Sequence, residues 1–243
     1  MKSLPPIEPI GHVRSAYKQK FGVPRQPGLV RGARAFLEIL PRVQPELSLD
    51  GLKEFSHIWA IFYFHRNDNA RFHAKVRPPR LRGKTVGIFA TRSPHRPNPI
   101  GLSLLEIESV EANGIWVRGA DLLDETPILD IKPYLREIES RPDARSGWSE
   151  ELSARQVAIE WSPQAQLALQ EARPTQTDIS DLKDMIEDTV ALDPRPLVYQ
   201  GPTGGESHYR DSHVVMVDGL DVHFSFQNHE QLVILKLTAA AAL

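Results

Sequence analysis

The chain has 243 residues, of which 41% are hydrophobic and 25% are charged, and it contains no cysteine. This composition is typical of a globular protein that buries one large core, or a main domain and a small one. The lack of cysteine excludes disulfide bonds and thiolate chemistry. No apolar run reaches signal-peptide length at the N-terminus or the roughly 20 residues that cross a bilayer, so we expect a cytoplasmic protein that binds no membrane.

The formal net charge of −2 conceals two oppositely charged halves. Residues 1–105 carry 18 basic and 6 acidic residues, whereas residues 106–243 carry 11 basic and 25 acidic ones. A strongly positive half favours a polyanionic partner, and nucleic acid is the leading candidate. The acidic half is expected to face solvent or to complement the basic half within a dimer.

Twenty prolines and 15 glycines favour short strands joined by tight turns over a helical bundle. Alternating, β-branched and aromatic residues predict strands within 7–17, 33–40, 55–65, 85–91, 103–110, 114–119 and 128–132. A loop with two prolines and two glycines at 21–30 follows the first strand, and Asn113-Gly114 predicts a hairpin. Successive strands without amphipathic helices between them predict a barrel or a sandwich.

The second half has a different pattern. Residues 139–153 show no clear period, which is typical of a linker or a long surface loop. Ser162-Pro163 predicts the start of a helix through 164–171, and apolar residues on one face predict a second helix over 178–192. Strands are then predicted at 213–217, 222–226 and 232–237, the first two joined at Asp218-Gly219.

The most unusual segment is Arg71–Leu105, which we call the basic stretch; it holds eight Lys or Arg residues, two histidines and no acid. Three prolines within Thr91–Ser103 exclude a continuous helix and fix an extended backbone. Several donors lie beside these prolines, namely Arg92, His95, Arg96 and Asn98. Such preorganised donors favour anion binding; the alternative is a connector whose arginines are only solvated.

Standard nucleotide and zinc-protease motifs are absent, since the chain has no GxGxxG after a strand, no Walker A sequence and no HExxH. The nine histidines are scattered without metal-ligand spacing, so no metal is predicted. The acidic segment 121–135 offers carboxylates for ribose hydroxyls or an amino group, or simply turn residues.

Taken in chain order, the motifs resemble those of the S-adenosylmethionine-dependent tRNA methyltransferases that act on N6-threonylcarbamoyladenosine beside the anticodon, the TsaA-like β-barrel proteins. The resemblance rests on IGHVRSAYKQKFGVPRQPGLV, FSHIWAIFYFH, VRPPRLRGK, FATRSPHRPNPIGLS, DLLDETPILDIKPYL and DPRP-x-x-Y. It runs from about residue 7 to residue 199 and continues loosely to the end of the chain. The resemblance implies a fold unlike the usual doubly wound methyltransferase, so the missing Gly-rich nucleotide loop is no objection.

The resemblance implies a mainly β protein, with a β-barrel methyltransferase domain and a small α+β C-terminal domain. We therefore predict a TsaA-like barrel that binds S-adenosylmethionine at residues 1–138. A linker or extended loop is predicted at 139–160, and the small α+β domain at 161–243. A homodimer is also implied by the resemblance.

The family's cofactor contacts, transferred to this sequence, fall on Gln26, Pro27, Gly28, His65, Arg66, Arg92, Leu102, Leu122, Leu123, Asp124 and Glu125. Arg92 is expected to pair with the cofactor carboxylate. Asp124 or Glu125 is expected to accept from its ammonium or ribose, and backbone groups near Leu102 and Leu122 to read the adenine edge.

The acceptor nitrogen is a poor nucleophile until it loses its proton, so a base or an oriented water is expected to assist. The candidates for the base are His95, His65, Asp193 and Tyr199, and the sequence leaves the choice open; His95 is alternatively a phosphate contact. RNA contacts are predicted at Arg77, Arg80, Arg82, Lys84, Arg96 and Arg195.

The resemblance implies an enzyme that transfers the methyl group of S-adenosylmethionine to N6 of threonylcarbamoyladenosine next to the anticodon of threonine tRNA. The expected partner is the anticodon arm of that tRNA. An alternative is a non-catalytic, S-adenosylmethionine-responsive RNA-binding or regulatory protein on the same barrel. An enzyme of this fold that acts on another small substrate is a third possibility.

Overall fold

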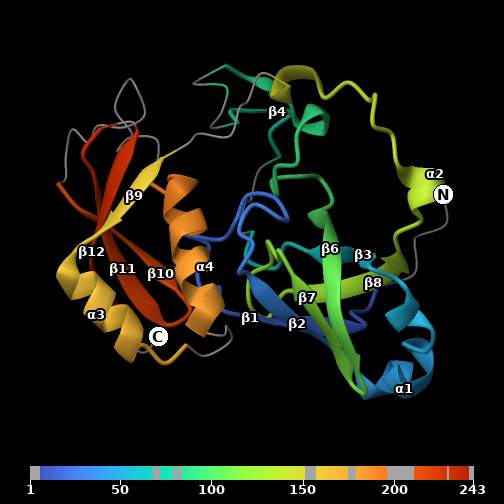
Figure 1. Cartoon of the computed structure of the whole chain (residues 1–243). Coiled ribbons are helices and arrows are strands. Elements are labelled where there is room, and N and C mark those ends of the chain that lie inside the picture. Colours follow the sequence, from blue (N-terminus) through green and yellow to red (C-terminus); the bar gives the residue numbers. More distant parts are fainter. Residues whose placement is uncertain are drawn as a thin grey trace. The chain divides into compact units, whose positions relative to one another are not determined.

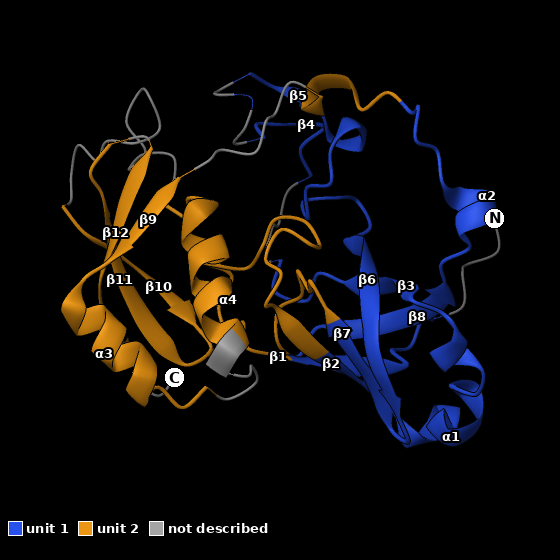
Figure 2. Cartoon of the chain, in the orientation of Figure 1, with its two compact units in different colours: residues 1–14, 36–117, 125–144 blue, residues 15–35, 118–124, 145–243 orange. Residues whose placement is uncertain are grey.

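The computed structural model describes residues 6–67, 72–78, 81, 84–150, 157–174, 179–195, 211–228 and 230–240, with side chains from 181 onward in the helix that starts at 179. The chain divides into two compact units (Figures 1 and 2). Unit 1 comprises residues 1–14, 36–117 and 125–144, and unit 2 comprises residues 15–35, 118–124 and 145–243.

Six strands form a closed barrel in the order β1-β2-β7-β6-β3-β8. Their bounds are β1 Gly11–Ser15, β2 Arg34–Ile39, β3 His57–Tyr63, β6 Ile100–Glu111, β7 Gly114–Arg118 and β8 Pro127–Pro133. β3 pairs antiparallel with both β6 and β8. The barrel confirms the fold class expected from the sequence and decides between barrel and sandwich.

Alternation along the strands explains how the barrel interior is filled. In β3, Ile58, Ala60 and Phe62 are buried, while the residues between them are at least partly exposed. Successive side chains of a strand point to opposite faces, so one face of each strand fills the barrel interior. Leu37 in β2 and Leu105 in β6 are fully buried in the same way.

Unit 1 also contains short elements outside the barrel. They are the 3-10 turns η1 Pro41–Val43, η2 Leu52–Glu54 and η4 Ile88–Ala90, the helices α1 Pro45–Ser48 and α2 Arg136–Glu139, and the two-stranded sheet of β4 Lys75–Val76 and β5 Val86–Gly87. The sequence predicted one strand over 85–91. The structure corrects this, because the strand ends at Gly87 and the chain continues as a 3-10 turn.

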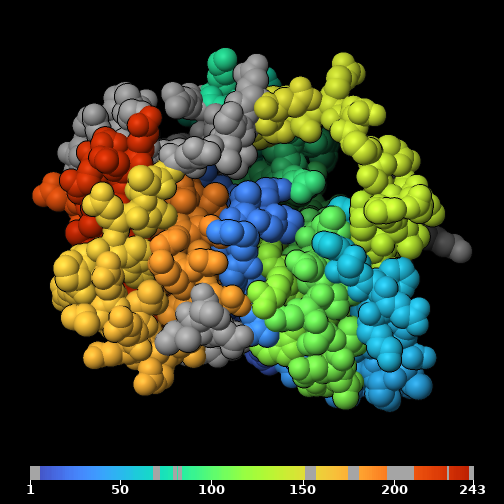
Figure 3. All heavy atoms as spheres, in the orientation of Figure 1, coloured from blue at the N-terminus to red at the C-terminus, as the bar shows by residue number. Residues whose placement is uncertain are grey.

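Unit 2 contains a four-stranded sheet in the order β10-β11-β12-β9 and two helices (Figure 1). The bounds are β9 Ala158–Trp161, β10 His213–Val217, β11 Leu220–Phe226, β12 Gln231–Ala239, α3 Pro163–Glu171 and α4 Ile179–Ala191, with the short 3-10 turn η5 at Gly147–Ser149. In the space-filling view, α3 lies at the surface (Figure 3). This is the small α+β arrangement that the sequence predicted.

Local chemistry sets the ends of these elements as expected. The Ser162 side chain accepts a 3.0 Å hydrogen bond from the Ala165 amide, with Pro163 in the first turn, which is the predicted N-cap of α3. Asp218 and Gly219 both have positive φ, 45° and 79°, and join β10 to β11 in a tight hairpin. One strand was missed, since β9 begins within the predicted linker and pairs in parallel with β12.

The core of unit 2 combines segments that are far apart in the chain. Tyr17 and Val30, from the first segment, pack in one buried cluster with residues of both helices and of β10, β11 and β12. The predicted boundaries at 138 and 160 divide the chain into consecutive segments. Each compact unit instead combines three segments that are separate in the sequence. Within the described residues, no helix is long and apolar enough to cross a membrane.

Candidate functional site

His65 and Arg66 follow the last residue of β3 in unit 1. His65 is half-buried, and its Nδ1 atom lies 3.5 Å from the hydroxyl oxygen of Thr126. Thr126 is itself buried, and its carbonyl accepts a 3.0 Å hydrogen bond from the Val13 amide. The imidazole is therefore held beside the start of β8, whereas the Arg66 side chain is exposed.

The proline-rich loop with Arg92 is joined to this turn by two hydrogen bonds. The Asn67 side-chain amide donates to the Pro94 carbonyl at 2.8 Å, and the Phe64 amide donates to the Pro99 carbonyl at 2.8 Å. The predicted cofactor residues after β3 and the exposed Arg92 thus belong to two connected loops of unit 1. The sequence predicted the proline-rich segment but placed His65 in a strand over 55–65, which the structure ends at Tyr63, and it could not predict that the two segments are joined.

Leu102 lies on β6 directly opposite Ile61 of β3. Its side chain is 52% exposed, whereas Gly101 and Ser103 on either side of it are buried. Leu102 therefore points away from the barrel interior and offers apolar surface to a ligand.

Glu125 has an unusual backbone conformation, with φ of 62° in the left-handed region. Its amide donates a 2.8 Å hydrogen bond to the Val13 carbonyl, and its carboxylate, half-exposed, pairs with the Arg14 guanidinium. Arg14 also pairs with Glu38 at 2.8 Å. A carboxylate placed in this way remains accessible to an ammonium or hydroxyl group of a ligand.

Asp124 has a different environment, in unit 2. Its carboxylate accepts a 2.9 Å hydrogen bond from the Ser15 amide and forms a 2.7 Å ion pair with Lys18. Only 12% of the Asp124 side chain is exposed. The Ser15 hydroxyl donates to the Leu122 carbonyl at 2.9 Å. Both carboxylate oxygens of Asp124 therefore have protein partners, so of the two predicted acids Glu125 is the better placed to bind a ligand. Leu122 is buried, and Leu123 is partly buried.

The loop with Gln26, Pro27 and Gly28 belongs to unit 2. The Gly28 amide donates a 2.8 Å hydrogen bond to the Gly119 carbonyl, which fixes one side of the loop. Gly28 has φ of 76°, and no atom lies within 4 Å of where a Cβ would stand. The Gln26 side chain donates to the Arg25 carbonyl. The loop is thus ordered but open at Gly28, as a backbone contact to a ligand requires.

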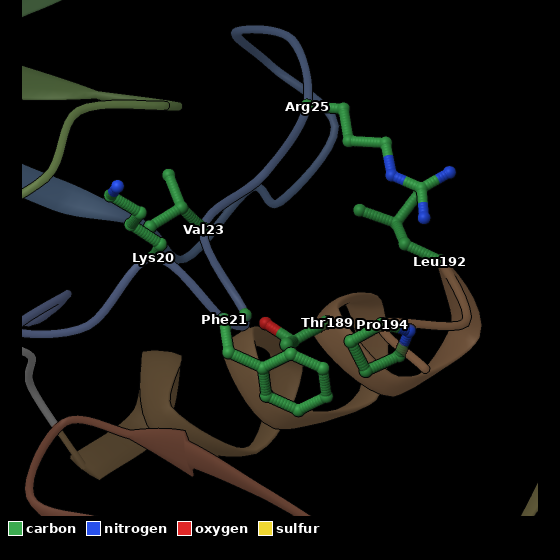
Figure 4. Close-up of a pocket in the computed structure, with 8 residues that line it drawn as sticks. Lys20, Phe21, Val23, Arg25, Thr189, Leu192 and Pro194 are labelled. Carbon is green, nitrogen blue, oxygen red and sulfur yellow. The ribbon is translucent and has the colours of Figure 1, made fainter. Parts of the chain in front are cut away.

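Unit 2 also has a shallow pocket of about 170 Å³ beside this loop (Figure 4). It is lined by Lys20, Phe21, Gly22, Val23, Arg25, Thr189, Leu192 and Pro194. In the close-up, Arg25 and Leu192 lie on one side, and Lys20 and Val23 on the other. Pockets for ligands of drug size have about 300–1,000 Å³, so this pocket alone is too small for a nucleoside cofactor.

Of the three candidate bases that the structure describes, His95 is the most exposed to a substrate. The Asp193 carboxylate is buried, and its oxygens accept from Arg195 at 2.6 and 2.8 Å. This bidentate pairing leaves Asp193 poorly placed to remove a proton from a substrate. His95 is exposed and His65 half-buried. Tyr199 lies outside the described residues, and the assignment of the base stays a prediction.

The predicted RNA contacts differ in exposure. Arg77 and Lys84 are exposed, and Arg96 is partly buried, donating to the Thr91 carbonyl at 2.8 Å. Arg195 is 1% exposed; besides its pair with Asp193, its guanidinium lies 4.0 Å from the centre of the Phe226 ring. A phosphate contact by Arg195 is therefore not favoured, whereas Arg77 and Lys84 fit the prediction. Arg80 and Arg82 lie outside the described residues.

Sequence reasoning missed Arg14 and Lys18, which pair with Glu125 and Asp124. Their basic character was visible, but their carboxylate partners lie more than 100 residues away in the chain, so no local pattern indicated the pairing. Among the described residues, no group of three or more His, Cys, Asp or Glu is placed to hold a metal ion.

A closed barrel followed by a small α+β sheet, without a nucleotide loop, is the architecture of a TrmO-type methyltransferase. Residues 12–140 match the family model of the tRNA-methyltransferase O N-terminal domain, and residues 154–240 match that of the TrmO C-terminal domain. The chain belongs to the TrmO family.

Curated relatives and a solved structure agree with this assignment. The putative S-adenosylmethionine-dependent methyltransferase RcsF of Pseudomonas aeruginosa is 40% identical over 230 residues, which cover 94% of this chain and 96% of the relative. The tRNA (adenine(37)-N6)-methyltransferase of Escherichia coli is 39% identical over 209 residues, which cover 83% and 87%. The crystal structure of TrmO from Pseudomonas aeruginosa matches with a TM-score of 0.74 at 34% identity, over 98% of this chain and all of that one.

Proposed function

We propose that this chain transfers a methyl group from S-adenosylmethionine to N6 of adenosine 37 in a tRNA. The observation that carries the proposal is the match of both family domains, which together span most of the chain. The name of the Escherichia coli relative gives the same reaction, and the name of the Pseudomonas aeruginosa relative gives the cofactor. The exposed arginine and lysine of the basic stretch support a nucleic-acid substrate.

The residues of unit 1 fit the chemistry of the cofactor. When bound, S-adenosylmethionine supplies a methyl group on a positively charged sulfur, together with a carboxylate, an ammonium and a ribose diol. The exposed guanidinium of Arg92 suits the carboxylate, and the accessible carboxylate of Glu125 suits the ammonium or a ribose hydroxyl. The exposed Leu102 side chain suits an apolar ring face. The contacts expected in unit 2 rest on the resemblance.

His65 or His95 would remove the proton of the acceptor nitrogen. A neutral imidazole has a nitrogen lone pair that can take up a proton as the N6–carbon bond forms. The His65 ring lies beside the buried Thr126 hydroxyl, whereas His95 is exposed. Alignment of the reacting groups and exclusion of water supply most of the rate in such a displacement.

We further propose that the acceptor is the threonylcarbamoyl form of adenosine in threonine tRNA, that the protein is a homodimer, and that it acts in the cytoplasm. The acceptor and the homodimer are implied by the family resemblance of the central motifs. The competing proposal, a non-catalytic protein that binds both S-adenosylmethionine and RNA, uses the same basic stretch and cofactor residues. Turnover of the cofactor in the presence of RNA separates the two.

The test is methyl transfer from labelled S-adenosylmethionine to threonine tRNA with and without its threonylcarbamoyl group. Label in N6 of the modified adenosine alone supports the full proposal. Label in both tRNAs supports methylation of adenosine 37 but not the requirement for the threonylcarbamoyl group. Tight binding of cofactor and tRNA without label favours the non-catalytic protein.

The role of Arg92 is tested separately by Arg92→Ala. Loss of one charged hydrogen bond is expected to weaken cofactor binding by about 1.5–3 kcal/mol, measured by calorimetry. Arg136→Ala is the control, since Arg136 is also an exposed arginine of unit 1 and pairs only with its neighbour Glu137 among the contacts described. Equal cofactor affinity in both variants would reject the assignment.

A further inference from the structure

Phe89 is the most exposed large hydrophobic side chain among the described residues, at 76%. It lies in η4, in the middle of the basic stretch, and neither the family resemblance nor the predicted site residues assign it a role. A single exposed hydrophobic residue is common on protein surfaces and needs no explanation by itself. Three features of its surroundings distinguish Phe89.

First, the backbone that carries Phe89 is fixed. The preceding Ile88 is 2% exposed and anchors the turn, and its amide donates a 3.0 Å hydrogen bond to the Ala74 carbonyl. The Ile88 carbonyl accepts from the Thr91 amide at 3.1 Å and from the Thr91 hydroxyl at 2.8 Å. The ring is therefore presented to solvent by an ordered turn, so little conformational entropy of the backbone is lost when a ligand binds.

Second, a cation lies beside the ring. The Arg96 guanidinium carbon is 5.7 Å from the centre of the Phe89 ring, and Arg96 is oriented by its 2.8 Å hydrogen bond to the Thr91 carbonyl. The acceptor of that bond is a carbonyl oxygen and not a carboxylate. The bond therefore does not offset the positive charge of Arg96 beside the aromatic ring.

Third, a second exposed aromatic residue comes from the adjacent segment. β4 and β5 pair antiparallel, and the hydrogen bond between Ile88 and Ala74 extends that pairing by one step. This bond places Ala74 beside Ile88, and Phe72, two residues before Ala74, is 58% exposed. Exposed aromatic rings among basic residues, without a nearby acid in the sequence, are the composition of surfaces that bind single-stranded nucleic acid.

We propose that Phe89 is a stacking platform for an unpaired nucleobase of the RNA substrate, with Arg96 beside it and Arg77 and Lys84 binding the backbone phosphates. The inference rests on the proposed tRNA substrate and extends it to a subsite. A base whose N6 is methylated has to leave its stack, so its neighbours in the anticodon loop also lose a stacking partner. An exposed phenyl ring replaces that partner, and it accepts any base because every base has a π-face.

The test compares tRNA dissociation constants at several salt concentrations. Phe89→Ala is expected to raise the dissociation constant roughly 5- to 160-fold, which corresponds to the loss of one stacked base. The slope of log K against log salt is expected to stay unchanged, because no charge is removed. Lys84→Ala is the contrasting variant and is expected to lower that slope by about 0.7–0.9.

Two further variants separate aromatic stacking from a purely apolar contact. Phe89→Trp is expected to retain or improve binding, whereas Phe89→Leu, which keeps apolar area but has no π-face, is expected to behave like Phe89→Ala. Leu47→Ala is the matched control, since Leu47 is 67% exposed in α1 and lies outside the basic stretch. Unchanged cofactor binding in each variant shows that the fold is intact.

The outcomes distinguish this proposal from the proposed function. If the wild-type protein methylates tRNA and Phe89→Ala binds tRNA as tightly as the wild type, only the stacking platform is rejected. If Phe89→Leu binds like the wild type, the contact is apolar and the platform is again rejected. If the wild-type protein neither binds nor methylates tRNA, the proposed function fails together with the subsite.

Discussion

Two basic regions of the chain, residues 14–31 and residues 71–105, differ in whether their side chains pair with acidic residues of the same chain. In residues 14–31, which we call the basic loop, three basic residues pair with acidic residues of the second half: Arg14 with Glu125, Lys18 with Asp124, and Arg31 with Asp188. The basic stretch at 71–105 has no acid in its own sequence, and its Arg77 and Lys84 are exposed.

This difference shows that charge counted along a sequence overestimates the surface available to phosphates. The sequence left open whether the acidic half faces solvent or complements the basic half of another subunit. Part of it instead pairs within the same chain, because three of its carboxylates form ion pairs with cations of the first half. We therefore expect the basic stretch, with its exposed Arg77 and Lys84, to be a region where positive charge acts on a partner. Four predictions compare groups that are buried or paired within the chain with groups that are exposed, from the largest expected effect to the smallest.

The largest effect is expected where a charge is buried with its partner. Arg195→Met is expected to destabilise the protein by about 3–5 kcal/mol, because it leaves the buried Asp193 carboxylate without its counter-ion. Arg77→Met, at an exposed position of the basic stretch, is expected to change stability by about 0.5 kcal/mol or less. Urea denaturation measures both. A loss below about 1 kcal/mol for Arg195→Met would show that the pair is not needed for folding.

The next effect tests whether the basic loop is held in place by packing. Gly22 has φ of 93°, and a Cβ there would lie 2.6 Å from the Val215 Cγ2 atom. Gly22→Ala is expected to cost about 1–3 kcal/mol in thermal or urea unfolding. The control is Gly147→Ala, where φ is also positive but no atom lies within 4 Å of the Cβ position. Equal losses would mean that Val215 moves aside and that packing does not fix the loop.

A smaller effect compares one arginine from each region. Arg77→Ala is expected to lower the salt slope of tRNA binding by about 0.7–0.9, because one phosphate contact is lost. Arg31→Ala removes the same charge, but Arg31 pairs with Asp188, so the slope is expected to stay unchanged. Filter binding at several salt concentrations measures both. Equal changes in slope would contradict the division into a paired and an available region.

The smallest effect concerns alkaline pH. Burial raises the pKa of Tyr17 in the folded protein, the nearby Thr189 hydroxyl opposes that shift, and Asp188 adds to it. The pKa of the phenol in the unfolded chain is about 10. The contribution of the neutral, buried phenol to folding stability is therefore present below that pH and is lost as the pH rises above it. Melting temperatures at pH 8 to 11 are expected to fall more steeply for the wild type than for Tyr17→Phe. Parallel curves would show that the phenol does not control alkaline stability.

Local sequence patterns predicted the elements that are determined by residues adjacent in the chain. The N-cap of α3 at Ser162 and the hairpin at Asp218-Gly219 depend on neighbouring residues alone, and the structure has both. The strand predicted over 85–91 was partly wrong, because hydrogen bonds from Thr91 to the Ile88 carbonyl close a 3-10 turn. β9 was missed because it pairs with β12, about 70 residues later.

The sequence predicted which residues belong to the site, but not the contacts and burial of their side chains. The family motifs indicated Asp124 and Glu125 as a pair, but only the structure separates the carboxylate held by Ser15 and Lys18 from the more exposed one. Nothing in the DPRP motif indicated that Arg195 is buried against Phe226. These differences arise from contacts across more than one segment of the chain, which a local pattern cannot show.

The interleaved build of unit 2 has a consequence for synthesis on the ribosome. Tyr17 and Val30 belong to a core whose other residues lie largely beyond position 160. At about 5–20 residues per second, the ribosome needs roughly 7–30 s to reach those residues after Val30. During that time the apolar side chains of the early segment lack most of their native partners. Nascent chains of this protein are therefore expected to bind chaperones through residues 15–35 until translation is nearly complete.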